Sequence, residues 1–281
     1  MTDPTLSQQD MDEVVARALA EDVGTGDATT RATIHEGARL KGTLRARGPM
    51  VVAGIPVAET VFRHIDPDVV FEARVSDGDT IQAGTVMAGV EGPAESILTA
   101  ERTALNLLHL LSAIATETRR YVDALEGTGC TLLDTRKTLP GLRALSKYAV
   151  RCGGGTNHRM RLDDGILIKD NHVAVAGSVG EAVRRAKAAD TGLKVQAECD
   201  TMAQVADALE AGADSLLLDN MTNDQLREAV ALVAGRIPLE ASGSVRLDTV
   251  RAIGETGVDY ASVGAITQSL PPVDIGLDFE A

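Results

Sequence analysis

Apolar and polar positions divide the first hundred residues into two patterns. Residues 8–20 place Val14, Val15 and Leu19 on one helical face, and a Gly-Thr-Gly-Asp turn follows them. Residues 40–92 instead form short β-type runs separated by glycines and Asp-Gly pairs. The pattern therefore predicts an N-terminal helix and, after it, a small β-rich domain.

The end of the β-rich region, DGDTIQAGTVMAGVEG, is similar to the hairpin of biotinyl and lipoyl carrier domains. Such carriers need a modifiable lysine in the turn, whereas this turn reads Met87-Ala88-Gly89. A carrier or assembly module is the non-enzymatic alternative, and the missing lysine argues against it. We expect a structural β-sandwich.

Residues 93–126 carry apolar side chains at mostly three- to four-residue spacings, which predicts helix. Because this length exceeds that of most globular helices, we expect a break and two helices. Arg102 stands among apolar neighbours. By pattern alone it is an exposed arginine whose stem covers apolar surface.

From residue 130 onward an apolar strand, a polar end and a helix recur as one unit. The expected strands are 131–134, 166–169, 194–198, 215–219, 237–242 and 260–264. Capping boxes start the intervening helices at Ser178, Thr201 and Thr222, and glycines stand where those helices should end. Alternating strands and helices predict a parallel sheet covered by helices. So many units favour a barrel, although an open sheet also fits the pattern.

Composition narrows the class of protein further. The formal net charge of −14 argues against nucleic acid or a membrane surface as a partner, and 2% aromatic residues without tryptophan argue against stacking platforms. Cys130, Cys152 and Cys199 are scattered, which suits a reducing compartment and predicts no zinc site or disulfide framework. The opening residues lack a signal-peptide pattern, and the apolar stretch 104–115 is too short to span a bilayer. We expect a cytoplasmic protein.

Charged residues gather at the predicted carboxyl ends of the strands, where α/β barrels bind ligands. Those of the early strands are cationic and those of the later strands anionic: Arg136, Lys137, His158, Arg159 and Lys169, then Glu198 and Asp219. Glycines at 243 and 264 leave backbone N–H groups open to a phosphate. The pattern predicts a small polyanion, a phosphate group and a divalent cation, with Mg²⁺ suited to carboxylates plus substrate phosphates.

Two other interpretations of these residues stay open. Any one of them could be a helix cap or a surface ion pair, although their gathering on one edge favours a site. A strand-end lysine such as Lys169 could also form a Schiff base, as in class I aldolases. His172, one helical turn beyond Lys169, is expected to support the site rather than react.

The chain resembles the quinolinate phosphoribosyltransferases. The resemblance rests on ERTALNLLHLLSAIAT, LLDTRKTLPGLR, KYAVRCGGGTNHRMRLDDGILIKDNH, LLLDN and VDYASVGAITQS, and it extends from Glu21 to near the end. It implies an incomplete α/β barrel of the type II phosphoribosyltransferases with an N-terminal open β-sandwich, assembled as a homodimer or a larger array of dimers. The implied domains are 1–110 plus 270–281 and 111–269. The implied reaction moves phosphoribose from phosphoribosyl pyrophosphate to quinolinate and releases CO2 and pyrophosphate.

The resemblance also implies roles for single residues. Quinolinate would be bound by Arg136, His158, Arg159 and Lys169, with Thr135 and Lys137 in the same loop. Lys169, Glu198 and Asp219 would be catalytic, and the two acids would lie near the ribose and share Mg²⁺ with phosphoribosyl pyrophosphate. The 5′-phosphate would be bound by Ser242, Gly243, Ser244, Val263, Gly264 and Ala265. Arg102 would reach the site of the neighbouring subunit, which replaces its first interpretation.

The sequence departs from the family pattern at three positions. Gln196 stands where a second acid is common, Ser244 where glycine or asparagine is common, and Gln268 where some relatives carry a basic residue. These differences concern the details of metal and phosphate binding. A molybdenum-transport-associated homologue of the same fold, with another substrate, is the alternative function.

Overall fold

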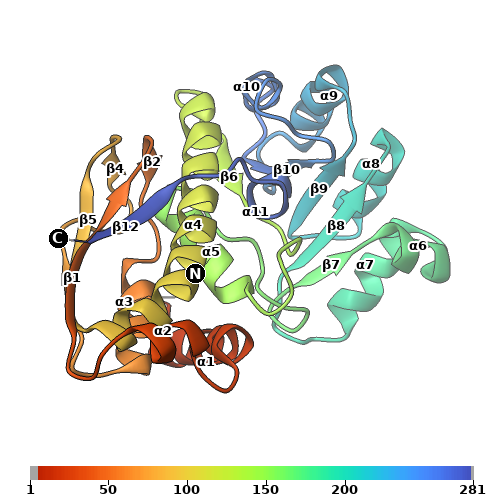
Figure 1. Cartoon of the computed structure of the whole chain (residues 1–281). Coiled ribbons are helices and arrows are strands. Elements are labelled where there is room, and N and C mark those ends of the chain that lie inside the picture. Colours follow the sequence, from red (N-terminus) through yellow and green to blue (C-terminus); the bar gives the residue numbers. More distant parts are fainter. Residues whose placement is uncertain (1–5, 280–281) are drawn as a thin grey trace. The chain divides into compact units, whose positions relative to one another are not determined.

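The computed structural model describes residues 6–279 and separates them into two units (Figure 1). The first unit comprises 6–119, 138–154 and 269–279, and the second comprises 120–137 and 155–268. The domain division implied by the resemblance, 1–110 plus 270–281 against 111–269, stays a prediction. The units differ from it chiefly because 138–154 belongs to the first unit.

Specific contacts tie this segment to the first unit. It contains α5 (Arg143–Cys152), where Tyr148 Oη donates a hydrogen bond to Asp77 Oδ2 at 2.6 Å. Asp77 in turn accepts hydrogen bonds from the N–H groups at the start of α3 (Ile55–Ile65). Gly153 lies so close to Thr118 that a Cβ would overlap it.

The first unit contains antiparallel strands and helices. Its four-stranded sheet has the order β12-β1-β5-β3, and a separate pair joins β2 and β4. The strands are β1 (Arg39–Ala46), β2 (Met50–Val51), β3 (Val70–Ala73), β4 (Thr80–Ile81), β5 (Val86–Pro93) and β12 (Ile275–Phe279). The helices besides α3 and α5 are α1 (Gln8–Val23), α2 (Ala28–Thr33) and α4 (Ala94–Leu125), the last of which runs on into the second unit. The expected N-terminal helix and β-rich region are confirmed.

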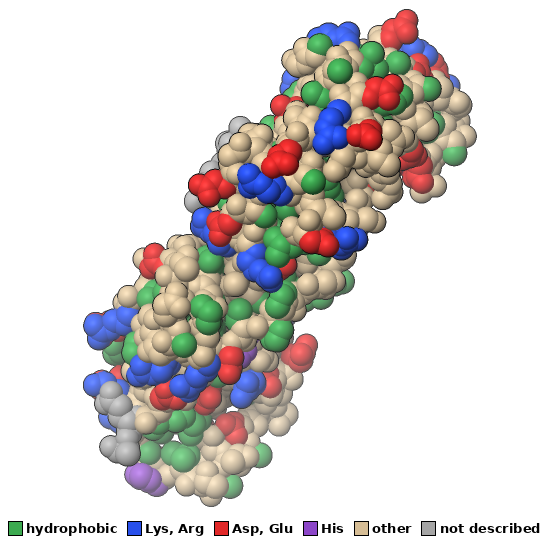
Figure 2. All heavy atoms as spheres, turned by 90° about the horizontal axis from the view of Figure 1, so that it is seen from above, with side chains coloured by type: hydrophobic (Ala, Val, Ile, Leu, Met, Phe, Trp, Pro, Cys, Tyr) green, Lys and Arg blue, Asp and Glu red, His purple; other side chains and the backbone are tan. Residues whose placement is uncertain are grey.

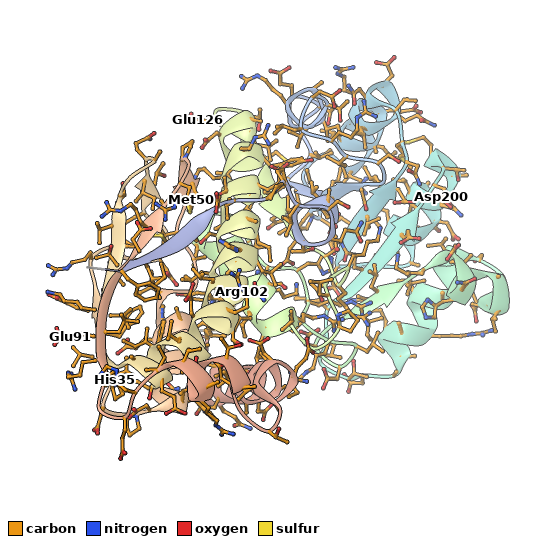
Figure 3. All side chains as sticks on the ribbon, in the orientation of Figure 1. His35, Met50, Glu91, Arg102, Glu126 and Asp200 are labelled. Carbon is orange, nitrogen blue, oxygen red and sulfur yellow. The ribbon has the colours of Figure 1, made fainter. Side chains whose placement is uncertain are left out.

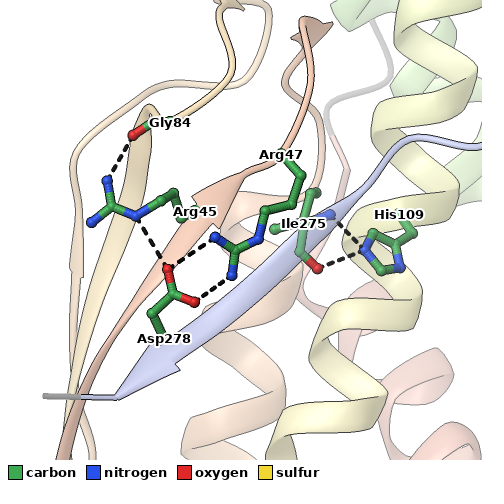
Figure 4. A network of polar contacts seen from close by, with 6 residues as sticks. All are labelled: Arg45, Arg47, Gly84, His109, Ile275 and Asp278. Carbon is green, nitrogen blue, oxygen red and sulfur yellow. Dashed lines mark hydrogen bonds and ion pairs between the residues drawn. The ribbon is translucent and has the colours of Figure 1, made fainter. Parts of the chain in front are cut away.

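The C-terminal strand β12 is fastened to the first unit by side chains as well as by pairing with β1 (Figure 4). Arg45 Nε lies 3.2 Å from Asp278 Oδ2, and Arg47 binds the same carboxylate. The hydrogen bond from Arg47 is the main cause that lowers the pKa of Asp278. His109 Nε2 lies 2.9 Å from the backbone of Ile275. These contacts hold β12 against β1 in the sheet of the first unit.

The break expected within residues 93–126 is wrong. The structure has one helix, α4, of 32 residues. Its sequence contains neither glycine nor proline, so nothing interrupts its backbone hydrogen bonds. Buried side chains recur along it from Ile97 to Leu125, so that packing supports the whole length.

The second unit is a six-stranded parallel sheet with helices between its strands. The strands are β6 (Thr131–Leu133), β7 (Ile166–Ile168), β8 (Val195–Cys199), β9 (Ser215–Asp219), β10 (Leu239–Ser242) and β11 (Tyr260–Ser262). The helices are α6 (Asp170–Ala176), α7 (Val179–Ala188), α8 (Met202–Glu210), α9 (Asn223–Val233), α10 (Val250–Gly254) and α11 (Ala265–Gln268).

The strand order decides between a barrel and an open sheet. It is β6-β11-β10-β9-β8-β7, so strands follow the chain from β7 to β11 and the first strand comes after the last. A doubly wound open sheet would instead reverse its order in the middle. Among the described residues, β6 and β7 stand at opposite ends of the sheet and are not paired, and Leu133 of β6 makes an isolated bridge to Thr156 in the segment before β7. The expected incomplete α/β barrel is confirmed.

Most local signals in the barrel work as expected. Thr201 and Thr222 form reciprocal capping boxes with Gln204 and Gln225. Ser178 also accepts a hydrogen bond from the backbone N–H of residue 181, while the carboxylate of that glutamate binds Arg185. These caps fix where the helices begin, and with them the lengths of the loops that follow the strands.

The surface carries side chains of both charges, and the thiols of the three cysteines have raised pKa values. On the face drawn in Figure 2, Lys and Arg side chains are interspersed with Asp and Glu side chains, without a broad basic patch. The three cysteines are free thiols, and burial raises the pKa of Cys130 and Cys199 to about 12 and that of Cys152 to about 11. Within residues 6–279 we find no helix whose length and apolar character would let it cross a membrane.

Candidate active site

The predicted site residues of the second unit lie in the segments around the carboxyl ends of its strands. Glu198 lies in β8, Asp219 ends β9 and Ser242 ends β10. Thr135, Arg136 and Lys137 follow β6, and Val263, Gly264 and Ala265 follow β11. Because carboxyl ends of parallel strands meet at one edge, the fold brings these segments together. Lys169 follows β7, while His158 and Arg159 precede it.

Asp134 organises the cationic side of the edge. It directly follows β6 and is completely buried. Its carboxylate accepts hydrogen bonds from Asn157 Nδ2 at 2.7 Å and from the backbone N–H of His158 at 2.8 Å. The loop that carries Arg136 is therefore tied to the segment that carries Arg159.

Arg136 and Arg159 form a partly buried pair of like charges. Burial, and after it the charge of Arg136, lowers the pKa of Arg159. Arg159 Nη1 also donates a 2.7 Å hydrogen bond to the carbonyl of Gly165, which fixes its direction. Two guanidinium groups that repel each other favour binding of an anion, and a dicarboxylate offers one carboxylate to each fork.

His158 has both ring nitrogens engaged within the barrel. Nδ1 accepts a 2.7 Å hydrogen bond from the backbone N–H of Arg159, and Nε2 lies 3.3 Å from Glu240 Oε2. A ring nitrogen that accepts a hydrogen bond carries no proton, so these contacts describe the tautomer with its proton on Nε2. The side chain is only 16% exposed. The direct contact of His158 with substrate that the resemblance implies stays a prediction.

Lys169 and Glu198 form a direct ion pair between the segment after β7 and strand β8. The side chain of Lys169 is 46% exposed and that of Glu198 is 10% exposed. A Schiff-base lysine needs a desolvated amine, so this environment does not favour the aldolase-like alternative. His172 Nδ1 accepts a 2.9 Å hydrogen bond from the backbone N–H of Lys169, which agrees with its expected supporting position.

The opposite side of the edge has an unusual backbone at Asn220, Gly243 and Ser244. All three have positive φ, at 53°, 88° and 51°. Asn220 Nδ2 donates to the carboxylate of Asp219, and its backbone N–H donates to the carbonyl of Ser242 at 3.0 Å. Such turns leave backbone N–H groups for an anion, as in other phosphate-binding loops.

Glycine is required at 243 by space as well as by conformation, and this yields a prediction. A Cβ there would overlap the side chain and backbone nitrogen of Asn220. Gly243→Ala should lower the free energy of unfolding by about 1–3 kcal/mol and raise the KM for a phosphorylated substrate, because Asp219 and the turn must move. Urea unfolding and steady-state kinetics measure both effects.

Gly235→Ala is the matched control, because Gly235 also has positive φ but open space around it. The control should lose stability through backbone strain alone and keep its KM. An unchanged KM in Gly243→Ala would contradict the role given to the turn.

Glu198 and Asp219 are the residues that could share a metal ion. They come from neighbouring parallel strands. Among residues 6–279 no group of three or more His, Cys, Asp or Glu could hold a metal ion by itself. Two carboxylates without further ligands fit Mg²⁺, which binds through one or two carboxylates completed by substrate phosphates.

Arg102 belongs to the first unit, where it lies on α4 and is exposed (Figure 3). It follows Glu101, whose pKa is raised by burial against the opposing effect of Arg102. Its neighbours on the other side, Thr103 and Ala104, are buried. Arg102 is therefore an exposed cation next to buried positions of α4.

The sequence pattern suggested no role for three residues that the structure places around the site: Asp134, Asn220 and Glu240. Asp134 and Asn220 follow strands directly, so their positions could have indicated a role. Glu240 lies inside an otherwise apolar strand and is 3% exposed. A charged residue within a predicted barrel strand is a signal that could have identified it.

Comparisons with known proteins match nearly the whole chain. Residues 114–278 match the family model described as quinolinate phosphoribosyl transferase, C-terminal domain, and residues 27–112 match that of its N-terminal domain. The chain is 45% identical over 274 residues to the nicotinate-nucleotide pyrophosphorylase (carboxylating) of Mycobacterium leprae, covering 95% of this chain and 96% of the relative. It is 41% identical to the probable enzyme of that name from Bacillus subtilis, covering 92% and 89%.

A solved structure agrees with these relatives. The nicotinate-nucleotide pyrophosphorylase from Francisella tularensis superposes with a TM-score of 0.95 at 37% identity, covering all of both chains. A structure of the same enzyme from Ehrlichia chaffeensis gives 0.93 at 40% identity, again over both full chains. None of these four relatives is named for molybdenum transport.

Proposed function

The chain belongs to the quinolinate phosphoribosyltransferase family, and on that basis we propose how its residues carry out the reaction. The enzyme transfers phosphoribose from phosphoribosyl pyrophosphate to the ring nitrogen of quinolinate, forming nicotinate mononucleotide, pyrophosphate and CO2 in NAD biosynthesis. Two observations carry our assignment of roles: the like charges of Arg136 and Arg159, and the ion pair of Lys169 with Glu198, in segments around the carboxyl ends of the barrel strands.

Quinolinate binds on the cationic side of the edge. Arg136 and Arg159 each bind one carboxylate, and the anion relieves the repulsion between them. Lys169 exchanges its contact with Glu198 for a carboxylate of the substrate. Thr135 and Lys137 shape the same loop. This arrangement aims the ring nitrogen at the anionic side, where the ribose binds, and most of the rate enhancement comes from such positioning.

The ribose binds beside Glu198 and Asp219. Departure of pyrophosphate develops positive charge on the anomeric carbon, and these two carboxylates stabilise it. The ring nitrogen of quinolinate then forms the new bond, and no protein nucleophile takes part. The nitrogen becomes cationic, so the ring can accept the electron pair left by CO2, and a proton replaces the lost carboxyl group.

The pyrophosphate donor binds with Mg²⁺. Glu198 and Asp219 would hold the ion together with phosphate oxygens of the substrate, and the ion would offset the charge that develops on the leaving group. The 5′-phosphate is bound by backbone N–H groups and hydroxyls of Ser242, Gly243, Ser244, Val263, Gly264 and Ala265. A Cβ at Gly264 would meet Lys137 at 3.0 Å, so this loop lies against the quinolinate loop.

The functional unit is a homodimer in which the partner subunit's Arg102 completes the quinolinate pocket. The exposure of Arg102 on the first unit supports this assignment, because such an arginine is accessible to a second chain. The protein acts in the cytoplasm, a reducing compartment in which its three free thiols persist.

An enzymatic assay tests the proposed function directly. Purified protein is mixed with quinolinate, phosphoribosyl pyrophosphate and Mg²⁺, and nicotinate mononucleotide is followed by absorbance and mass spectrometry. We expect product that depends on all three components and disappears with EDTA. A folded protein that forms no product, or product formed equally well without Mg²⁺, contradicts the proposal. Absence of a borohydride-trapped adduct on Lys169 is also expected.

A further inference from the structure

Glu240 lies in the interior of the barrel, directly beneath the site. It is 3% exposed and lies in the middle of β10, two residues before Ser242. Alternate residues of a strand point to the same face, so Glu240 and Ser242 point the same way. The same holds for Gln196 and Glu198 in β8.

A contact across the barrel confirms that both lower residues point inward. Gln196 Nε2 donates a 2.8 Å hydrogen bond to Glu240 Oε2, although β8 and β10 are separated by β9 in the sheet. Side chains of non-neighbouring strands meet only on the concave side of a curved sheet. The buried Glu240 and the half-buried Gln196 therefore form a polar layer below Glu198 and Ser242.

The carboxylate of Glu240 is charged and held by donors. Burial raises its pKa, but hydrogen bonds from His158, Ser262 and Gln196 outweigh burial and hold the pKa below its usual value. Its other oxygen, Oε1, is buried without a hydrogen-bond partner among the described residues. Burying a charge costs free energy unless the charge is paired. The hydrogen bond from His158 offsets part of this cost for the carboxylate of Glu240.

His158 links the carboxylate of Glu240 to the backbone of Arg159. Its Nε2–H group donates to Glu240, while Nδ1 accepts the backbone N–H of Arg159. The ring thus orients the peptide from which the Arg159 side chain extends. Asp134 anchors the same segment through the backbone N–H of His158. Two buried carboxylates therefore hold this short segment. Asp134 binds the backbone N–H of His158, and Glu240 binds the imidazole of the same residue.

We propose that Glu240 is a positioning residue for quinolinate binding, which acts through His158 to hold Arg159 in place beside Arg136. This inference rests on the proposed binding of quinolinate at these two arginines. It assigns His158 an orienting role through its Nε2–H tautomer. Gln196, which stands where related chains often carry an acid, then contributes a donor to Glu240 and leaves a single carboxylate in the layer.

The test is Glu240→Gln, which keeps the shape and removes the charge. We expect the KM for quinolinate to rise about tenfold, while kcat and the KM for phosphoribosyl pyrophosphate change less than about twofold, because only the segment that carries Arg159 is loosened. Glu228→Gln, the same change on the exposed face of α9, is the control and should change nothing. An equal rise of both KM values, or an unchanged quinolinate KM, overturns the proposal.

A swap variant separates the position of the charge from loss of folding. Gln196→Glu with Glu240→Gln returns one carboxylate to the same layer, and we expect part of the quinolinate affinity to return. In the unmodified protein, long-range ¹H–¹⁵N spectra should show His158 as the Nε2–H tautomer, and a ring that carries a proton on Nδ1 overturns the proposal even if no variant folds. Activity of the unmodified protein distinguishes failure of this inference from failure of the proposed function.

Discussion

Arg159→Ala should raise the KM for quinolinate about 100-fold and leave the KM for phosphoribosyl pyrophosphate nearly unchanged. Removing one partner of a desolvated charge pair typically weakens binding by 2–5 kcal/mol, which sets this scale. The protein itself should stay folded, because Arg159 repels Arg136 and the hydrogen bond of its Nη1 goes to the carbonyl of Gly165 in a nearby loop. Initial rates with each substrate varied in turn measure the effect.

Arg161→Ala is the matched control. Arg161 lies two residues further along the chain, is exposed and pairs with Asp163. Its removal should leave both KM values unchanged, since exposed ion pairs contribute little. If both variants behave alike, or if Arg159→Ala weakens both substrates equally, quinolinate does not bind where we place it.

Two variants with weakened quinolinate binding should restore activity when they share one dimer. If the partner subunit's Arg102 completes each site, a heterodimer of Arg102→Ala and Arg159→Ala contains one site with both defects and one intact site. At a quinolinate concentration near the KM of the unmodified enzyme, about half of the sites per purified heterodimer are then active, whereas either homodimer is nearly inactive. Co-expression with two different affinity tags yields the heterodimer, and its rate at that quinolinate concentration is compared with that of the unmodified dimer.

The control for this experiment is a heterodimer of Arg136→Ala and Arg159→Ala. Both residues lie in the second unit, so each of the two sites keeps one defect and activity should stay lost. Activity in that control would indicate that the subunits had exchanged or been contaminated. An inactive Arg102→Ala/Arg159→Ala heterodimer, or a monomeric active enzyme, would show that Arg102 serves its own subunit or none.

Local sequence signals were enough to define the elements of the barrel and the order of charges along its edge. Each strand is a short apolar run, and Thr201 and Thr222 mark helix starts by hydrogen bonds within a few residues. Because carboxyl ends of parallel strands share an edge, the amino-acid order alone could place Lys169, Glu198 and Asp219 in one site. Propensity and periodicity suffice for such features, since the interactions behind them span only a few residues.

How those elements are joined depends instead on contacts between distant segments. The chain pattern allowed an open sheet as well as a barrel, and strand order settles the matter by placing β6 beside β11. The expected break in α4 was wrong, because helix length alone does not predict a break. The absence of glycine and proline and the buried side chains along α4 keep it continuous. Segment 138–154 joined the first unit through contacts such as Tyr148 with Asp77.

The arrangement within the site was likewise beyond local reasoning. His158 and Glu240 lie far apart in the sequence, and their contact depends on the curvature that turns both side chains into the barrel. The sequence places Asp134 and Asn220 at strand ends. It does not show that Asp134 binds the backbone N–H of His158, or that Asn220 binds the carboxylate of Asp219. Residue types and spacing therefore indicated the chemistry, whereas register and closure of the sheet decided which groups lie at its edge and which hold those groups in place.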